Sequence, residues 1–326
     1  MAHPAHILPS TARRVLLSVN PGAGARHRHD LIANLQEALT AQGLEVTIPE
    51  NLEQLHQLAS DPAVRAELRA VIAAGGDGTV ALVANLTPPG TPLAILPLGT
   101  ENLLAKYLHC TVDVQQLAQT IAGGVTIQLD AGQAGERLFL LMTGVGFDAE
   151  VVRRMHEQRQ GGHISHLSYA KPIFAAIRNY QYPELRIYCR DAEGQEQELS
   201  ARWAFVVNVP RYAGGLAISP DAAADDGLLN VCTFKEGSLL RGLVYLSGVL
   251  LGQHKHWNHF VTVRTSEVRI TSTAPVPFQL DGDPGGYLPV DIKILPRRLT
   301  LLVSAAWAQQ HGFTVEPSLG NAMPGK

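Results

Sequence analysis

The chain has 326 residues, of which 46% are hydrophobic and 17% charged, and its formal net charge is −3. This length suits two folded domains, and the charge balance shows neither the basic excess of a nucleic-acid-binding protein nor an acidic tract typical of disorder. The three cysteines are far apart with no C-x-x-C spacing, which favours a reducing, cytoplasmic location. The longest apolar window, residues 239–251, carries Arg241 and is too short to span a bilayer.

The N-terminal half alternates short apolar runs with helical patterns. The apolar runs predict strands at residues 15–19, 44–48, 70–74 and 92–96. The helical spacings predict helices at residues 31–39, at 52–68 with an interruption at Asp61-Pro62, at 79–86 and at 101–108. This alternation predicts a doubly wound α/β domain, in which helices cover both faces of a parallel sheet.

Three of these strands end in loops that contain glycine, at Asn20, Gly75 and Gly99. In open parallel sheets, ligands bind at the carboxyl ends of the strands. We therefore expect the three loops to converge on one ligand.

The most distinctive loop is Gly75-Gly-Asp-Gly-Thr79, which joins a buried strand to a helix. Glycines let backbone N–H groups approach an anion, and the helix N-terminus adds a partial positive charge. Asp77 would repel a bound phosphate unless it holds a cation, a ribose hydroxyl or a proton, so the turn suits a nucleotide with a divalent metal. The alternative is a structural turn in which Asp77 caps the helix.

The C-terminal half changes to strands separated by turns of Gly, Asp and Pro. We predict strands at residues 126–129, 137–143, 184–189, 203–209, 228–234, 262–271 and 290–295, with helical insertions at 149–158, 167–180 and 238–252. This pattern indicates a mostly antiparallel β-sandwich. A last strand at residues 299–304 and a short helix at 305–311 are expected to follow.

Six short motifs occur in order along the chain. They are Asn20-Pro-x-x-Gly24, Gly75-Gly-Asp-Gly-Thr79, Pro97-Leu-Gly-Thr-x-Asn102, Gly144-x-Gly-Phe-Asp148, Asp225-Asp-Gly-Leu-Leu229 and Gln279-Leu-Asp-Gly-Asp283. One such motif is a weak signal, but six in order make the chain resemble the diacylglycerol kinase catalytic family, which includes sphingosine kinases and small bacterial lipid kinases.

The resemblance implies an N-terminal α/β ATP-binding domain, a C-terminal β-sandwich and an active site between them. We place the first domain at residues 1–130, with residues 299–316 packing back on it, and the substrate domain at residues 131–298. Residues 317–326 are expected to form a flexible tail.

The resemblance also implies which residues bind ATP. The matching positions are Asn20, Pro21, Gly22, Gly24, Gly75, Gly76, Asp77, Gly78, Thr79, Gly99, Thr100 and Asn102. Thr47, at the end of the second strand, is a further expected nucleotide contact by its position.

Two groups of residues match metal-binding positions of the family. Asp77 and Asp130 match carboxylates that manage the catalytic Mg²⁺, directly or through water. In the small bacterial members a structural metal lies in the segment that matches Asp225–Leu229, with ligands corresponding to Asp226 and the backbone carbonyls of Ala223 and Leu228. Oxygen ligands from a loop suit Mg²⁺. A plain Asp-Gly turn before a strand explains this segment equally well.

The last motif matches the part of the family that receives the phosphoryl group. Phosphoryl transfer needs an acceptor hydroxyl that is held in line and relieved of its proton, and a carboxylate can be that base. The family pattern is Asp-Gly-Glu, and here it is Asp281-Gly282-Asp283. Either Asp281 or Asp283 can be the catalytic proton acceptor. The structural alternative is a hairpin turn.

The chain departs from the family at Gly99-Thr-Glu-Asn-Leu103, where Gly-Thr-Gly-Asn-Asp is usual. Glu101 adds a side chain where glycine is common, and Leu103 removes an acid expected near the metal. Glu101 either stands in for the missing charge or leaves an enzyme with weakened catalysis or a changed substrate.

The resemblance therefore implies an ATP- and Mg²⁺-dependent kinase for diacylglycerol or a related lipid. The apolar helical insertions at residues 165–180 and 238–252 either contact the inner face of the membrane peripherally, line an acyl-chain pocket, or simply cover one sheet of the sandwich, which is the commoner arrangement. Two alternatives stay open. One is a small-molecule kinase of the NAD-kinase type, which shares Gly-Gly-Asp-Gly-Thr, and the other is a nucleotide-binding regulator that has lost catalysis. The sequence does not name the lipid or the oligomeric state, for which a homodimer is one option.

Overall fold

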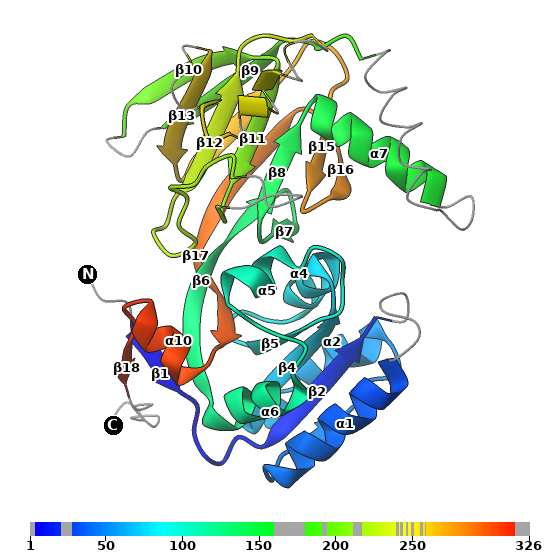
Figure 1. The fold of residues 1–326 in the computed structure, drawn as a ribbon. Helices are drawn as coiled ribbons and strands as arrows, with labels where there is room; N and C mark the ends of the chain where they lie inside the picture. The colour runs from blue at the N-terminus through cyan, green and yellow to red at the C-terminus, as the bar shows by residue number, and fades with distance from the viewer. Residues whose placement is uncertain are drawn as a thin grey trace. The chain divides into compact units, whose positions relative to one another are not determined.

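The computed structural model describes residues 4–20, 28–159, 180–190, 194–210, 217–238, 241, 244–245, 247–248, 251–254, 257 and 259–316. The chain forms two compact units (Figure 1). Unit 1 consists of Met1–Leu129 and Arg297–Lys326, and unit 2 of Asp130–Pro296. Two strands, β6 (Val125–Ala134) and β17 (Val290–Leu302), run from one unit into the other, so unit 2 is an insertion in the chain of unit 1.

Unit 1 is built on a parallel sheet. Its strands are β3 (Glu45–Thr47), β2 (Arg14–Val19), β4 (Leu68–Gly75), β5 (Pro92–Pro97) and the end of β17, in that order. Each neighbouring pair is parallel. Every residue of β4 and β5 is buried, as expected for apolar strands with both faces covered.

Helices cover this sheet on both faces. They are α1 (Arg28–Ala41), α2 (Leu52–Ser60), α3 (Pro62–Ala66), α4 (Asp77–Leu86), α5 (Leu103–Tyr107), α6 (Val114–Gly123) and α10 (Ala305–Gln310). Leu35 of α1 and Ile121 of α6 share one apolar cluster with Ile72 of β4. The α/β prediction for this half is confirmed. A short strand β1 (Pro4–Ile7) also pairs with β6 and with β18 (Thr314–Glu316).

Two arginines, the buried Arg69 and the half-buried Arg298, hold helix C-termini in unit 1. Arg298 donates to the carbonyls of Ala84 and Thr87 at the end of α4, at 3.0 and 2.9 Å. Arg69 donates to the carbonyl of Ile121 at the end of α6, at 2.7 Å. Burial lowers the pKa of both guanidinium groups. Helix C-termini leave carbonyls without intrahelical partners and favour positive charge, so both arginines fix the helices they reach.

Unit 2 is an antiparallel sandwich, as predicted. One sheet has the order β13 (Phe260–Thr265), β12 (Leu229–Phe234), β11 (Trp203–Val207), β8 (Met142–Val145), β15 (Pro277–Leu280) and β16 (Asp283–Tyr287). The other contains β10 (Glu196–Ala201), β9 (Leu185–Arg190), β14 (Glu267–Thr271) and β17. Ile187 and Ile292 of one sheet and Val231 of the other belong to the same buried core. Strand β7 (Arg137–Phe139) pairs with β6, and α7 (Phe147–Arg159) follows β8.

Several predicted elements are wrong in extent. Residues 262–271 form two strands in different sheets rather than one, because the chain turns at Ser266. Residues 137–143 likewise split between β7 and β8. The two strands predicted at 290–295 and 299–304 are one strand, β17. The predicted tail, residues 317–326, and the helical insertion at 167–180, except Tyr180, lie outside the described residues.

Candidate functional site

Described residues of the three predicted glycine loops of unit 1 come together at the carboxyl ends of β2, β4 and β5. The Leu98 N–H donates to the Gly75 carbonyl at 2.9 Å. A Cβ atom on Gly99 would lie 2.5 Å from the Cα of Gly76, closer than real Cβ contacts, so the two backbones touch only because both residues are glycine. The Asn20 side-chain amide donates to the Thr79 hydroxyl at 3.0 Å. The structure thus brings together residues of all three loops.

Asn102 fixes the shape of the β5–α5 loop. Its backbone is left-handed, with φ +49°, a conformation that asparagine tolerates better than most residues. Its side-chain amide accepts from the Gly99 N–H at 3.0 Å and donates to the Gly99 carbonyl at 2.7 Å. Asn102 is therefore a loop-forming residue that faces Gly99.

Asp77 caps a helix, but not the one it begins. Its carboxylate accepts from the N–H groups of Leu103 at 2.9 Å and Leu104 at 3.1 Å, the first two residues of α5. This ties the β4–α4 loop to the β5–α5 loop. Each carboxylate oxygen keeps a second lone pair, so the arrangement fits a nucleotide-bound Mg²⁺ in contact with Asp77.

The departures at Glu101 and Leu103 have separate structural outcomes. The Leu103 side chain is buried, while its N–H binds Asp77. Glu101 lies 3.8 Å from Lys106, and both side chains are largely exposed, so this pair contributes little.

The remaining predicted nucleotide residues are placed as follows. Gly78 lies in the first turn of α4, Thr100 is exposed in the β5–α5 loop, and Thr47 is exposed at the end of β3. Pro21, Gly22 and Gly24 lie outside the described residues.

In unit 2, Asp281 and Gly282 form the turn between β15 and β16, with φ +51° and +90°. The Asp281 carboxylate accepts from the N–H groups of Leu140, Leu141 and Met142 at 2.6, 2.9 and 2.9 Å. Three amide donors use most of its lone pairs. Asp281 therefore anchors the turn to the start of β8 and the two residues before it.

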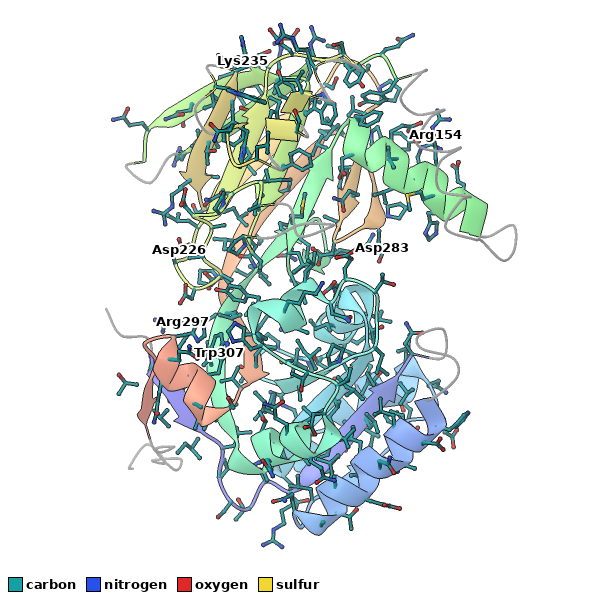
Figure 2. All side chains as sticks on the ribbon, in the orientation of Figure 1. Arg154, Asp226, Lys235, Asp283, Arg297 and Trp307 are labelled. Atoms are coloured by element: carbon teal, nitrogen blue, oxygen red, sulfur yellow. The ribbon has the colours of Figure 1, made fainter. Side chains whose placement is uncertain are left out.

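A second contact holds the turn from the other side. The Gly282 N–H donates to the buried side chain of Gln279 at 2.7 Å, and Gln279 donates to Asp148 at 3.0 Å. Gly144 has no room for a side chain, because a Cβ atom would lie 2.2 Å from an Asp148 oxygen. Asp283 follows this rigid turn with its residue exposed to solvent (Figure 2). Of the two predicted catalytic carboxylates, Asp283 belongs to the more exposed residue.

Asp130 is buried beside the Ala223–Leu228 loop. One carboxylate oxygen accepts from the Gly227 N–H at 2.7 Å, and its own N–H donates to the Ala224 carbonyl at 2.6 Å. Asn208, which the sequence analysis missed, donates to the carbonyls of Asp130 at 3.0 Å and Leu140 at 2.8 Å. Asn208 thus connects the loop to the segment that holds Asp281.

The Ala223–Leu228 loop fits a bound metal ion poorly. One Asp226 oxygen accepts from the Leu228 N–H at 2.9 Å, and the other contacts the Arg264 guanidinium.

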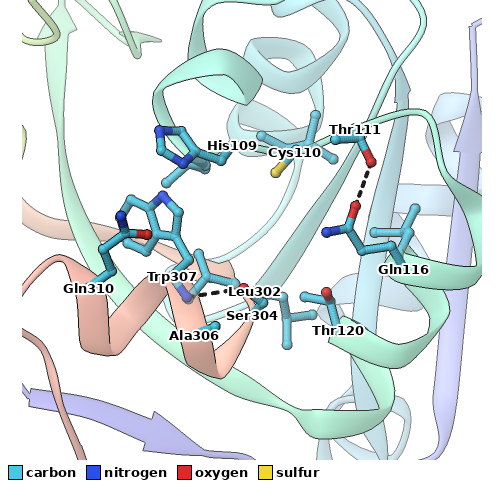
Figure 3. Close-up of a pocket in the computed structure, with 14 residues that line it drawn as sticks. His109, Cys110, Thr111, Gln116, Thr120, Leu302, Ser304, Ala306, Trp307 and Gln310 are labelled. Carbon is cyan, nitrogen blue, oxygen red and sulfur yellow. Dashed lines mark hydrogen bonds between the residues drawn. The ribbon is translucent and has the colours of Figure 1, made fainter.

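A pocket of about 230 Å³ lies in unit 1, between the α5–α6 connection, α6 and α10 (Figure 3). Cys110 and Trp307 line it, and none of the predicted site residues does. Burial raises the pKa of the Cys110 thiol to about 11. In the described part of the chain the buried indole N–H of Trp307 has no hydrogen-bond partner.

Two family models match the chain. The diacylglycerol kinase catalytic domain matches residues 14–134, and the YegS C-terminal NAD kinase beta sandwich-like domain matches residues 142–303. No helix within the described ranges is long and apolar enough to cross a membrane.

Two relatives are similar to the chain over most of its length, and one of them is named as a diacylglycerol kinase. The chain is 26% identical to a diacylglycerol kinase of Bacillus subtilis over 77% of this chain and 83% of that one. It is 28% identical to an uncharacterized protein of Synechocystis over 71% of this chain, and it spans only 54% of that protein.

Solved structures share the fold. A diacylglycerol kinase structure from Bacillus anthracis aligns with a TM-score of 0.66 at 23% identity, over 90% of this chain and 98% of that one. Yeast NADH kinase aligns with a TM-score of 0.50 at 10% identity, over 98% of this chain and 96% of that one. Since the two family models together cover most of its residues, the chain belongs to the diacylglycerol kinase catalytic family.

Proposed function

We propose that the chain is an ATP- and Mg²⁺-dependent lipid kinase that transfers the γ-phosphoryl group to the hydroxyl of diacylglycerol or a related lipid. The observation that carries this proposal is the Asp281–Asp283 turn, which presents an exposed carboxylate on a backbone held from two sides. Membership of the family and the name of the Bacillus subtilis relative support the lipid class.

The glycine loops of unit 1 supply the nucleotide site in this proposal. Gly76 and Gly99 let the β4–α4 and β5–α5 loops approach closely, and the N-terminus of α4 adds a dipole that favours phosphate oxygens. Asn20 and Thr79 hold the first loop against the second. Mg²⁺ bound with ATP would contact Asp77 and neutralise charge on the phosphates.

Asp283 is the proposed catalytic base. The acceptor oxygen forms a bond to the γ-phosphorus, the bond to the bridging oxygen of ADP breaks, and the hydroxyl proton passes to the Asp283 carboxylate. Asp281 is a positioning residue, because its oxygens are engaged by three backbone N–H groups. This division of roles follows from the different surroundings of the two carboxylates.

The departure at Leu103 is compatible with catalysis. Asp77 binds the backbone N–H of residue 103, so this contact survives whichever side chain stands there. For this reason we favour an active enzyme over a regulator that has lost catalysis.

The test is phosphate transfer from γ-labelled ATP with Mg²⁺, offered separately to diacylglycerol, phosphatidylglycerol, a sphingoid base, a monoacylglycerol and NAD. We expect label in one lipid, and a loss of about 100-fold or more in Asp283→Asn. The matched control is Asp291→Asn, an exposed carboxylate on β17 of the same unit, which should keep full activity.

Two outcomes would contradict the proposal. Label in NAD alone would indicate a small-molecule kinase. ATP binding without label in any acceptor would indicate the nucleotide-binding regulator.

A further inference from the structure

The Ala223–Leu228 loop is held by internal contacts at the place where the family resemblance implies a metal ion. Both nearby carboxylates direct oxygens toward backbone N–H groups of the loop: Asp130 toward Gly227 at 2.7 Å and Asp226 toward Leu228 at 2.9 Å. Each of these N–H groups occupies one lone pair of the oxygen that accepts it. The loop is therefore closed by amide donors.

The remaining oxygen of Asp226 is bound by a cation that the chain itself supplies. The Arg264 guanidinium contacts it at 2.5 Å, and the side chains of Asp226 and Arg264 are 23% and 49% exposed. Charge-assisted hydrogen bonds of this kind are shorter and stronger than hydrogen bonds between neutral groups.

Sheet register fixes Arg264 beside the loop. Strand β12 begins at Leu229, directly after the loop, and pairs antiparallel with β13. Leu229 lies opposite Thr265 and Asn230 opposite Arg264. The guanidinium is thus carried on a strand adjacent to the loop exit, from which it reaches back to Asp226.

A divalent cation and Arg264 would compete for the same carboxylate. With Arg264 paired to Asp226, a metal ion bound there would place further positive charge next to the guanidinium. We propose that Arg264 takes the place of the metal ion in this chain, so that the loop folds and holds its shape without a divalent cation.

The test measures the thermal unfolding midpoint of the full chain, without nucleotide or lipid, in EDTA and in millimolar Mg²⁺ or Ca²⁺. We expect the wild-type midpoint to be the same in all three solutions. Arg264→Gln should lower the midpoint by about 2–4 °C in EDTA, and added Mg²⁺ or Ca²⁺ should restore part of this loss. Arg264→Lys, which keeps the charge, should stay insensitive to the metal.

The matched control is Arg269→Gln, which breaks the more exposed Arg269–Asp291 ion pair in the same unit and should leave the midpoint nearly unchanged. The proposal fails if Mg²⁺ or Ca²⁺ raises the wild-type midpoint and Asp226→Asn abolishes that rise. It also fails if Arg264→Gln is no more destabilising than Arg269→Gln. Neither result depends on phosphoryl transfer, so this inference and the proposed kinase activity can fail separately.

Discussion

The carboxylates of Asp77 in unit 1 and Asp281 in unit 2 both bind backbone N–H groups. They differ in how many oxygen lone pairs these contacts leave unused. Asp77 accepts hydrogen bonds from two backbone N–H groups at the start of α5, and Asp281 accepts three at the start of β8 and just before it. Asp77 keeps one free lone pair on each oxygen, while Asp281 has few left. The comparison shows that an acid in a family motif can organise a loop, and that only unused lone pairs leave it able to meet a ligand or a proton.

The largest expected effect is that of Asp281→Asn. The substitution replaces one acceptor oxygen with an NH₂ group that faces N–H donors, so the free energy of unfolding should fall by about 3 kcal/mol. Asp283→Asn should change it by less than about 0.5 kcal/mol, because Asp283 is exposed. Urea denaturation of both variants measures the difference. Equal stabilities would show that the three N–H contacts do not hold the turn.

Next in size is the effect of Gly99→Ala. The added Cβ would lie 2.5 Å from the Cα of Gly76 and 2.7 Å from an Asn102 oxygen, so the two loops joined by Asp77 must separate. We expect a destabilisation of about 1–3 kcal/mol and weaker ATP binding by calorimetry. Gly123→Ala is the matched control, because nothing lies within 4 Å of its added Cβ. ATP affinity that is unchanged in Gly99→Ala would remove this loop from the nucleotide site.

Asp77→Asn tests the Asp77 side of the comparison with Asp281. The asparagine keeps one acceptor oxygen but removes the negative charge at the start of α5. The expected loss is about 1 kcal/mol, as for a helix cap, which is smaller than that for Asp281→Asn. Thermal unfolding of the two variants side by side gives the ranking. The reverse order would mean that the α5 contact matters more than the acceptor turn.

The smallest effect concerns Cys110. It lies just after the C-terminal end of α5, whereas Asp77 binds the N-terminal end of that helix. Because burial raises the thiol pKa to about 11 and the thiolate is the reactive form, alkylation should be slow at neutral pH and accelerate as the pH rises toward that value. Cys189 and Cys232 are buried and should react little. Asp77→Asn should speed the labelling at fixed pH if α5 loosens, which mass spectrometry can follow. A rate that levels off near pH 9 would contradict the raised pKa.

The sequence predicts the parts of the fold that depend on local pattern. Residues 70–74 and 92–96 are continuous apolar runs, and such runs become strands of a parallel sheet with both faces covered. Strand β10 was missed because it lies at a sheet edge with Leu199 as its main apolar residue. The sequence analysis also does not predict helix α6, although Asp113 caps it. Its buried face has only three residues, Leu117, Ala118 and Ile121.

Long-range partners explain why the site was only partly predicted. Asp77 and Leu103 are 26 residues apart, and Asp281 and Leu141 are 140 apart, so no periodicity connects them. Arg264 carries no motif at all, and its role appears only when strand register places it opposite Asn230. The sequence predicts which residue types lie at the site. It does not show which carboxylate lone pairs stay unused once the backbone N–H groups are bound.

The insertion of unit 2 has a consequence for dissecting the protein. The last part of β17 returns to unit 1 and pairs in parallel with β5, with Thr300 opposite Pro92 and Leu301 opposite Leu93. A fragment that stops at Leu129 therefore lacks a strand of its own sheet and the Arg298 contacts to α4. A fragment that contains all of unit 1 needs both of its chain segments, Met1–Leu129 and Arg297–Lys326, joined by a linker. Exchange of unit 2 between relatives likewise requires two junctions in the chain, one at each end of the insertion.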